Sequence, residues 1–124
     1  MQNRRAVSPY VYPGLGITAG QMHLDNFLSE CCEKFPFDLD DLKGRSRMQD
    51  VAFVRHAICH LLRYKEKKTF TEIGRIFGRD HATAISAVKR WDNLLSYNDH
   101  KAQTFNLVVV QCYKRHNFNF ISHE

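Results

Sequence analysis

The chain has 124 residues, enough for one domain with a modest hydrophobic core, and its 44% hydrophobic and 25% charged residues are typical of a folded protein rather than a disordered one. No apolar stretch is long enough for a membrane span, and the N-terminal residues lack the apolar core of a signal peptide, so we expect a cytoplasmic protein. The net charge of +5 is uneven: residues 42–90 hold twelve Lys and Arg against four acidic residues, which favours a polyanionic partner over a merely solubilising surface.

The two ends of the chain are predicted to lie outside the folded domain, which we place at residues 21–116. Residues 1–20 contain two prolines and three glycines among aromatic residues, a composition typical of an irregular arm. The segment "SPYVYPGLG" in this arm is suited to docking on a partner protein, or it is a disordered leader. The tail, residues 117–124, receives no assignment.

Apolar spacing predicts the first two helices. One begins at Gln21 and ends before Pro36, with a single stripe at Leu24, Phe27, Leu28, Cys31 and Phe35. The segment "FDLDDL" then predicts a short turn with Asp38 as a cap, and "KGRSR" is a basic loop. The second helix runs from about Met48 to Tyr64. Its inner stripe is Val51, Val54, Ile58, Leu61 and Leu62, and its predicted outer face carries Gln49, Arg55, His56 and Arg63.

Residues 69–95 have the pattern of a helix-turn-helix. Thr69 precedes Glu72 by three residues, which is the pattern of a capping box at a helix start. The buried face of that short helix is Phe70, Ile73 and Phe77. Gly78 and Arg79 then break it, and Asp80 is placed to cap the next helix, whose apolar positions are Ile85, Val88, Trp91 and Leu95.

Residues 100–116 satisfy both a strand and a helix pattern. The segment "FNLVVVQCY" is rich in β-branched residues, yet Phe105, Val108, Val109 and Cys112 have helical spacing. In a chain that is otherwise helical we favour a helix. The predicted fold is therefore all-α, a helix-turn-helix domain of about five to six helices with an irregular N-terminal arm.

The second helix of a helix-turn-helix enters the DNA major groove, and its first residues meet the base edges. Turning Ile85, Val88 and Trp91 toward the core leaves an outer face of Ala82, Ser86, Lys89, Arg90 and Asn93, with His81 and Thr83 at the helix start. Side chains of these kinds can bind base edges, thymine methyl groups and phosphates. The alternative is that Asp80 only caps the helix and the basic residues are only solvated.

The segment "EIGRIFGRDHATAISAV", residues 72–88, closely resembles the signature of the C-terminal DNA-binding domain of the bacterial replication initiator DnaA. Matching positions are Glu72, Ile73, Gly74, Phe77, Gly78, Arg79, Asp80, His81, Thr83 and Ala87. The resemblance extends upstream over the basic loop and the long helix, and in all it covers roughly residues 20–113. It implies a helix-turn-helix fold and binding to double-stranded DNA, for which a site like a DnaA box is a candidate.

The resemblance also implies roles for single residues. Arg47 matches an arginine that enters the minor groove, Arg55 and His56 stand where the family has an Arg-Gln pair that contacts DNA, and Lys89 matches a basic backbone contact. Residues 80–83 match the base-reading segment. The candidate DNA-binding residues are Arg45, Arg47, Arg55, His56, Arg79, Asp80, His81, Ala82, Thr83, Ser86, Lys89 and Arg90. Three departures from the family pattern are one glycine missing from the turn, Ala82 in place of threonine and His56 in place of glutamine. They leave the fold and DNA binding in place but are enough to change the preferred base sequence.

Other chemistry is not expected. The sequence contains no G-x-x-x-x-G-K-[ST] loop, so we expect neither nucleotide binding nor any other cofactor, and no catalytic constellation indicates an enzyme. His56, Cys59 and His60 have helical spacing, but no second ligand pair follows, so no metal site is predicted. The four cysteines are predicted to be thiols, mostly buried.

The functional prediction is a sequence-selective DNA-binding protein of the bacterial cytoplasm, associated with the nucleoid. It would act as a regulator, an origin-site competitor or a replication accessory, on a chromosome, a phage or another mobile element. The alternative is an interaction module that uses the same helix-turn-helix face and the N-terminal arm to dock on a partner protein. Salt dependence distinguishes the two, because phosphate contacts weaken steeply with salt.

Overall fold

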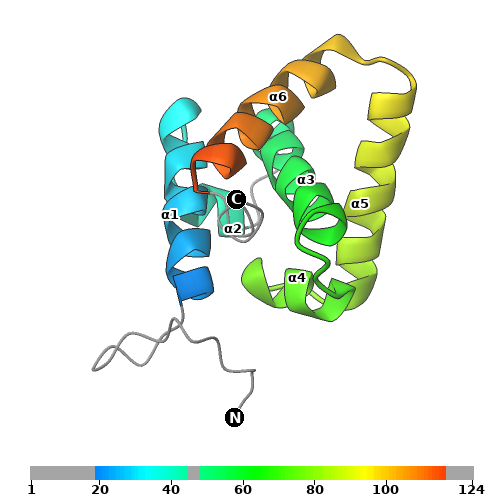
Figure 1. Ribbon diagram of the computed structural model, residues 1–124. Coiled ribbons are helices and arrows are strands. Elements are labelled where there is room, and N and C mark those ends of the chain that lie inside the picture. Colours follow the sequence, from blue (N-terminus) through cyan, green and yellow to red (C-terminus); the bar gives the residue numbers. More distant parts are fainter. Residues whose placement is uncertain (1–18, 45–47, 117–124) are drawn as a thin grey trace.

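A computed structural model describes residues 19–44 and 48–116, all of whose regular elements are helices (Figure 1). The helices are α1 (Ala19–Lys34), α2 (Leu39–Lys43), α3 (Gln49–Tyr64), α4 (Phe70–Ile76), α5 (His81–Ser96) and α6 (His100–Arg115). The predicted all-α class is confirmed, and so is the helix over residues 100–116. The tail, Arg45, Arg47 and nearly all of the predicted arm lie outside the described residues.

Side-chain caps start four of these helices, because the first amide groups of a helix have no partner within it. Asp38 and Asp41 form a capping box on α2, and Thr69 and Glu72 form the predicted one on α4. The Asp80 side chain accepts a hydrogen bond from the Thr83 amide at 2.9 Å, which confirms the predicted cap of α5. The segment "FDLDDL", predicted as a turn, instead caps and forms most of the short helix α2, which also includes Lys43 from the predicted basic loop.

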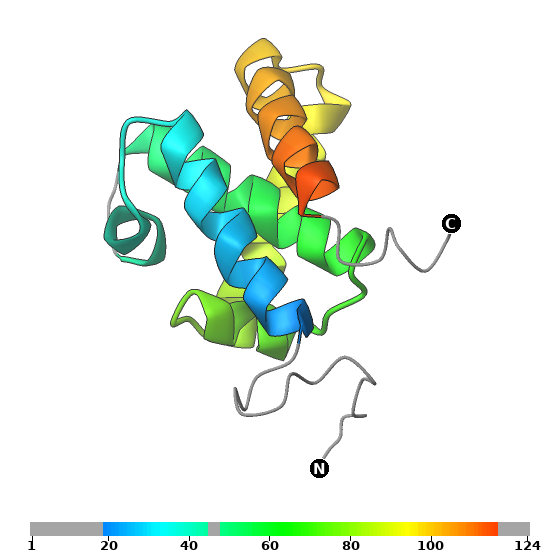
Figure 2. The same cartoon turned by 60° about the vertical axis from the view of Figure 1, so that its left-hand side comes forward.

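The central helix α3 organises the core and packs against α2, α4, α5 and α6 (Figures 1 and 2). Its residues Val51, Val54, Ile58 and Leu62 are fully buried, as predicted from their spacing. α1 packs against α2 and α6. None of the described helices is both long and apolar enough to cross a membrane.

The inner face of α5 differs in one respect from the predicted stripe. Val88 and Trp91 are buried as predicted, but Ile85 is only half-buried, and Ala84 and Ala87 are buried instead. Small side chains let the backbone of α5 come close to α3 and α4, its two main packing partners. The result is a tight helix-turn-helix unit whose opposite face remains exposed.

Candidate nucleic-acid interface

The turn between α4 and α5 sets the angle of the helix-turn-helix. The Phe77 and Arg79 amides both donate to the Gly74 carbonyl, at 3.1 and 2.7 Å, and Gly78 adopts a left-handed conformation with φ of 66°. A Cβ atom on Gly74 would lie 2.4 Å from the Arg79 carbonyl oxygen, so only glycine fits there. The chain therefore folds back directly onto α4 before α5 begins.

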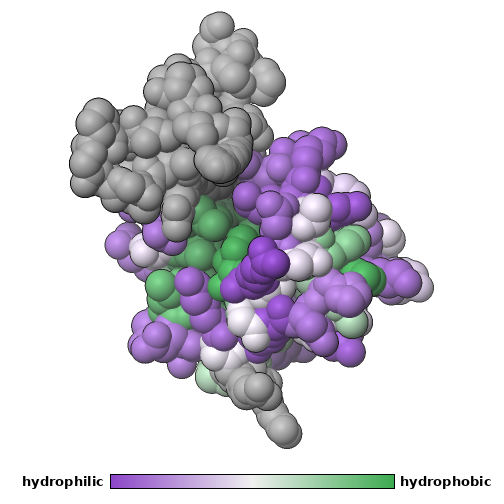
Figure 3. Space-filling model, turned by 90° about the horizontal axis from the view of Figure 1, so that it is seen from below, coloured by the Kyte–Doolittle hydropathy of each residue, from purple (hydrophilic) through white to green (hydrophobic). Residues whose placement is uncertain are grey.

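The outer face of α5 is exposed where the sequence predicted it. His81, Ala82, Thr83, Ser86, Lys89, Arg90 and Asn93 are all exposed. Asp80 precedes them, and its backbone and side-chain hydrogen bonds with Thr83 lower the pKa of its carboxyl group. The start of α5 thus presents hydroxyl, imidazole and methyl groups, and the two basic residues, Lys89 and Arg90, follow about two turns later. Seen from below the view of Figure 1, most of the described surface in view is hydrophilic, and the hydrophobic residues show mainly in one area left of centre, with a few more on the right (Figure 3).

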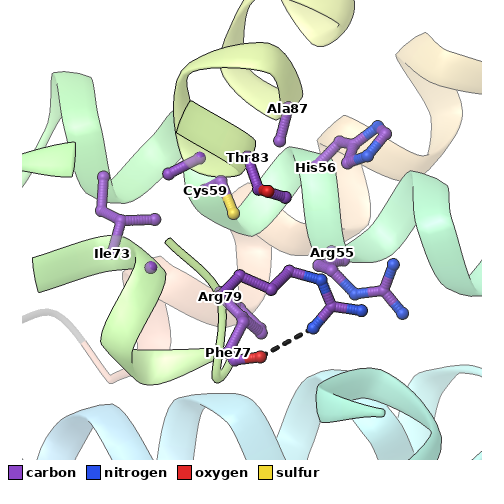
Figure 4. Close-up of a pocket in the computed structure, with 10 residues that line it drawn as sticks. Arg55, His56, Cys59, Ile73, Phe77, Arg79, Thr83 and Ala87 are labelled. Atoms are coloured by element: carbon purple, nitrogen blue, oxygen red, sulfur yellow. Dashed lines mark hydrogen bonds between the residues drawn. The ribbon is translucent and has the colours of Figure 1, made fainter. Parts of the chain in front are cut away.

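A shallow hollow of about 330 Å³ lies between the start of α5 and α3, and His56 lines it from α3. The α5 residues around it are Asp80, Ala82, Thr83, Ser86, Ala87 and Arg90. His56 also borders a smaller cavity of about 80 Å³ beneath α5 (Figure 4). Of the residues predicted from the long helix, His56 therefore lies closest to the face that the α5 residues form.

His56 is held in its neutral form. Burial lowers the pKa of its imidazole to about 4, and the positive charges of Arg55, Arg90 and Arg79 act in the same direction. At neutral pH His56 is therefore a hydrogen-bonding group without charge.

This shift predicts a pH effect on stability. Because the pKa of His56 is about 4 in the folded protein and near 6.5 when unfolded, the unfolded state takes up the proton first. The contribution of His56 to stability is complete above about pH 6.5 and is lost as the pH falls toward 4. We expect the Tm of His56→Gln to fall less than that of the wild type between pH 7 and 4. Identical pH profiles of the two proteins would show that His56 is not the group responsible.

Arg55 does not lie on the outer face of α3, where the sequence placed it. Only 7% of its surface is exposed. Its Nε donates to the Leu42 carbonyl at 2.9 Å and its Nη2 donates to the Gly44 carbonyl at 3.4 Å. The prediction of an outward side chain was wrong because the end of α2 covers this position, a contact that helical spacing does not reveal. A DNA contact by Arg55 stays a prediction.

Arg79 is also turned toward the protein. Its Nη1 donates to the carbonyls of Phe77 at 2.7 Å and Lys43 at 3.3 Å, and its Nη2 donates to the Gly44 carbonyl. A second hollow, of about 430 Å³, lies between α2 and the start of α5 and is lined by Lys43, Gly44, Gly78, Arg79, Asp80 and Thr83. Lys43 was not among the predicted DNA-binding residues, although it is the first residue of the basic loop "KGRSR" and could have been included.

The three residues considered as metal ligands do not converge. Cys59 is buried, and burial raises the pKa of its thiol to about 12. His60 instead bonds Asp92, with 2.6 Å between Nε2 and Oδ1. No group of three or more His, Cys, Asp or Glu in the described part of the chain could hold a metal ion.

Comparison with known proteins identifies relatives of this chain. The family described as "bacterial dnaA protein helix-turn-helix" matches residues 24–90. The chromosomal replication initiator protein DnaA of Mycoplasma pneumoniae is 29% identical over 83 residues, which cover 67% of this chain and 19% of that protein. DnaA 2 of Protochlamydia amoebophila is 33% identical over 67 residues, covering 54% and 15% of the two chains. DnaA of Microcystis aeruginosa is 29% identical over 98 residues, which cover 78% of this chain and 21% of that protein.

These matches cover about a fifth or less of the length of each relative. No solved structure gives a significant match. The matched family segment contains α4, the turn that follows it and α5 as far as Arg90.

Proposed function

Because the chain belongs to the bacterial DnaA helix-turn-helix family, we propose that it binds double-stranded DNA sequence-selectively, with α5 in the major groove. The observation that carries this proposal is the exposed outer face of α5, opposite a face closed by Ala84, Ala87 and Trp91. A helix whose inner face is fixed in this way presents its outer side chains in one orientation, which base recognition requires.

The residues of α5 divide into two roles along the helix. His81, Ala82 and Thr83 at its start would meet base edges, where hydrogen bonds and methyl contacts carry sequence information. Ser86 follows one turn later on the same exposed face. Lys89 and Arg90 would contact backbone phosphates, which increase affinity for every sequence alike.

We propose that the protein acts on DNA as a regulator, a competitor for origin sites or a replication accessory in the bacterial cytoplasm. The similar proteins are named as chromosomal replication initiators, which supports a role near replication. The present sequence contains no phosphate-binding loop, so the proposed binding is independent of nucleotide and involves no enzymatic step.

Salt dependence of duplex binding tests this proposal. Lys89→Gln and Arg90→Gln should each flatten the slope of log affinity against log salt by about 0.9, the contribution of one phosphate contact. Lys114→Gln, at an exposed position of α6, removes the same charge elsewhere and should leave the slope nearly unchanged. Equal slopes for all three variants and the wild type, with normal folding, would contradict DNA contact by α5 and favour the interaction module.

A further inference from the structure

The C-terminal end of α2 is held by two arginines from other parts of the chain. Arg55 on α3 donates to the carbonyls of Leu42 and Gly44, and Arg79 in the turn before α5 donates to those of Lys43 and Gly44. Three successive carbonyl groups of the chain thus accept hydrogen bonds from two guanidinium groups, and the Gly44 carbonyl accepts from both. Figure 4 shows the two side chains next to each other, with the bond from Arg79 to Phe77.

This arrangement compensates for the shortness of α2. A helix of five residues leaves most of its C-terminal carbonyls without partners inside the helix, and that end carries partial negative charge. Arginine suits this position because its planar group can donate to several acceptors at once, whereas a lysine ammonium is a point charge on a flexible stem. Arg79 uses this property to join Phe77, in the helix-turn-helix, to Gly44 at the end of α2.

The two arginines have backbone partners in place of acidic ones. No hydrogen bond or salt bridge to an Asp or Glu side chain is found for either within residues 19–44 and 48–116. Their positive charges repel. Burial lowers the pKa of the Arg55 guanidinium, and the nearby charge of Arg79 lowers it further. Two like charges side by side repel each other, and the hydrogen bonds that the arginines donate to the carbonyl groups offset this repulsion.

We propose that Arg55 and Arg79 are positioning residues: together they fix the end of α2 beside the start of α5, and thereby the hollow that Lys43 and Thr83 line, rather than contacting DNA themselves. This inference rests on the proposed DNA binding. It differs from the roles that the resemblance implied, because the guanidinium donors of both residues are directed to the protein backbone.

Charge-preserving variants test this inference. Arg79→Lys keeps the charge but cannot donate to Phe77 and Gly44 together, so we expect it to lower affinity for a selected duplex by about tenfold, as much as Arg79→Gln does. Arg55→Lys should behave in the same way. Arg75→Gln, at an exposed position of α4, removes the same charge as Arg79→Gln without involving the Arg55–Arg79 pair and should have little effect.

Amide hydrogen exchange in the free protein gives a readout that does not depend on DNA. The Leu42 and Gly44 amides donate to the Asp38 and Asp41 carbonyls, and they should exchange at least about tenfold faster in Arg79→Lys, while the Ile73 amide in α4 is unchanged. Wild-type affinity of Arg79→Lys, or unchanged exchange of the α2 amides, would overturn the inference. A wild-type protein that binds no duplex would instead contradict the proposed function, and the exchange result would still report on the arginines.

Discussion

Gly74→Ala should destabilise the protein by at least about 3 kcal/mol, because the substitution forces the turn away from α4. The added Cβ would lie 2.4 Å from the Arg79 carbonyl oxygen and 2.9 Å from that of Asp80. Both atoms belong to the backbone, so neither can move without displacing the start of α5. For a domain whose total stability is on the order of 5–15 kcal/mol, this loss is large. Urea denaturation monitored by helical circular dichroism measures it.

Gly78→Ala is the matched control for Gly74→Ala. Gly78 has a φ of 66°, but nothing lies within 4 Å of its added Cβ, so the cost is confined to the left-handed backbone. That cost is about 1–2 kcal/mol. If Gly74→Ala lowered the free energy of unfolding no more than Gly78→Ala does, this result would contradict the close approach of the turn to α4.

Trp91→Ala should cost about 3–5 kcal/mol, the usual range for deleting a buried aromatic side chain. Trp91 is 0% exposed, and it joins three helices. Its ring meets the Phe53 ring edge-on at 5.3 Å between centroids, and its Nε1 donates to Asn106 Oδ1 at 2.9 Å. Truncation therefore removes contacts of α5 with both α3 and α6.

The control for Trp91→Ala is Tyr97→Ala, at the end of the same helix. Tyr97 is 80% exposed, so its removal should change stability by no more than about 0.5 kcal/mol. Thermal unfolding of the two variants gives the comparison. Similar Tm values for both would contradict the packing of α5 on α3 and α6.

The parts of the fold that depend on neighbours in sequence could be predicted. The Thr69–Glu72 capping box, the Asp80 cap and the exposed face of α5 follow from local spacing, and the structure contains all three. The family resemblance added the expectation of a DNA-binding role, which spacing alone does not supply.

The parts that depend on tertiary contacts were missed. Arg55 has the spacing of a surface residue, and nothing near it in sequence shows that the end of α2 covers it. Ala84 and Ala87 were missed because alanine occurs both inside and outside proteins, so its burial is decided by how closely α5 packs on its neighbours. A base preference of the proposed α5 surface would depend on the geometry of the DNA complex, which no residue pattern determines.

Selection of bound duplexes from a random pool, followed by sequencing, tests the central claim most directly. We expect the wild type to enrich one short motif, and Ala82→Thr to change the preferred bases at a few positions with nearly unchanged Tm, because Ala82 is exposed at the start of α5. His81→Ala should lose enrichment at neighbouring positions. No motif from the folded wild type, or the same motif from all three proteins, would contradict base recognition by α5.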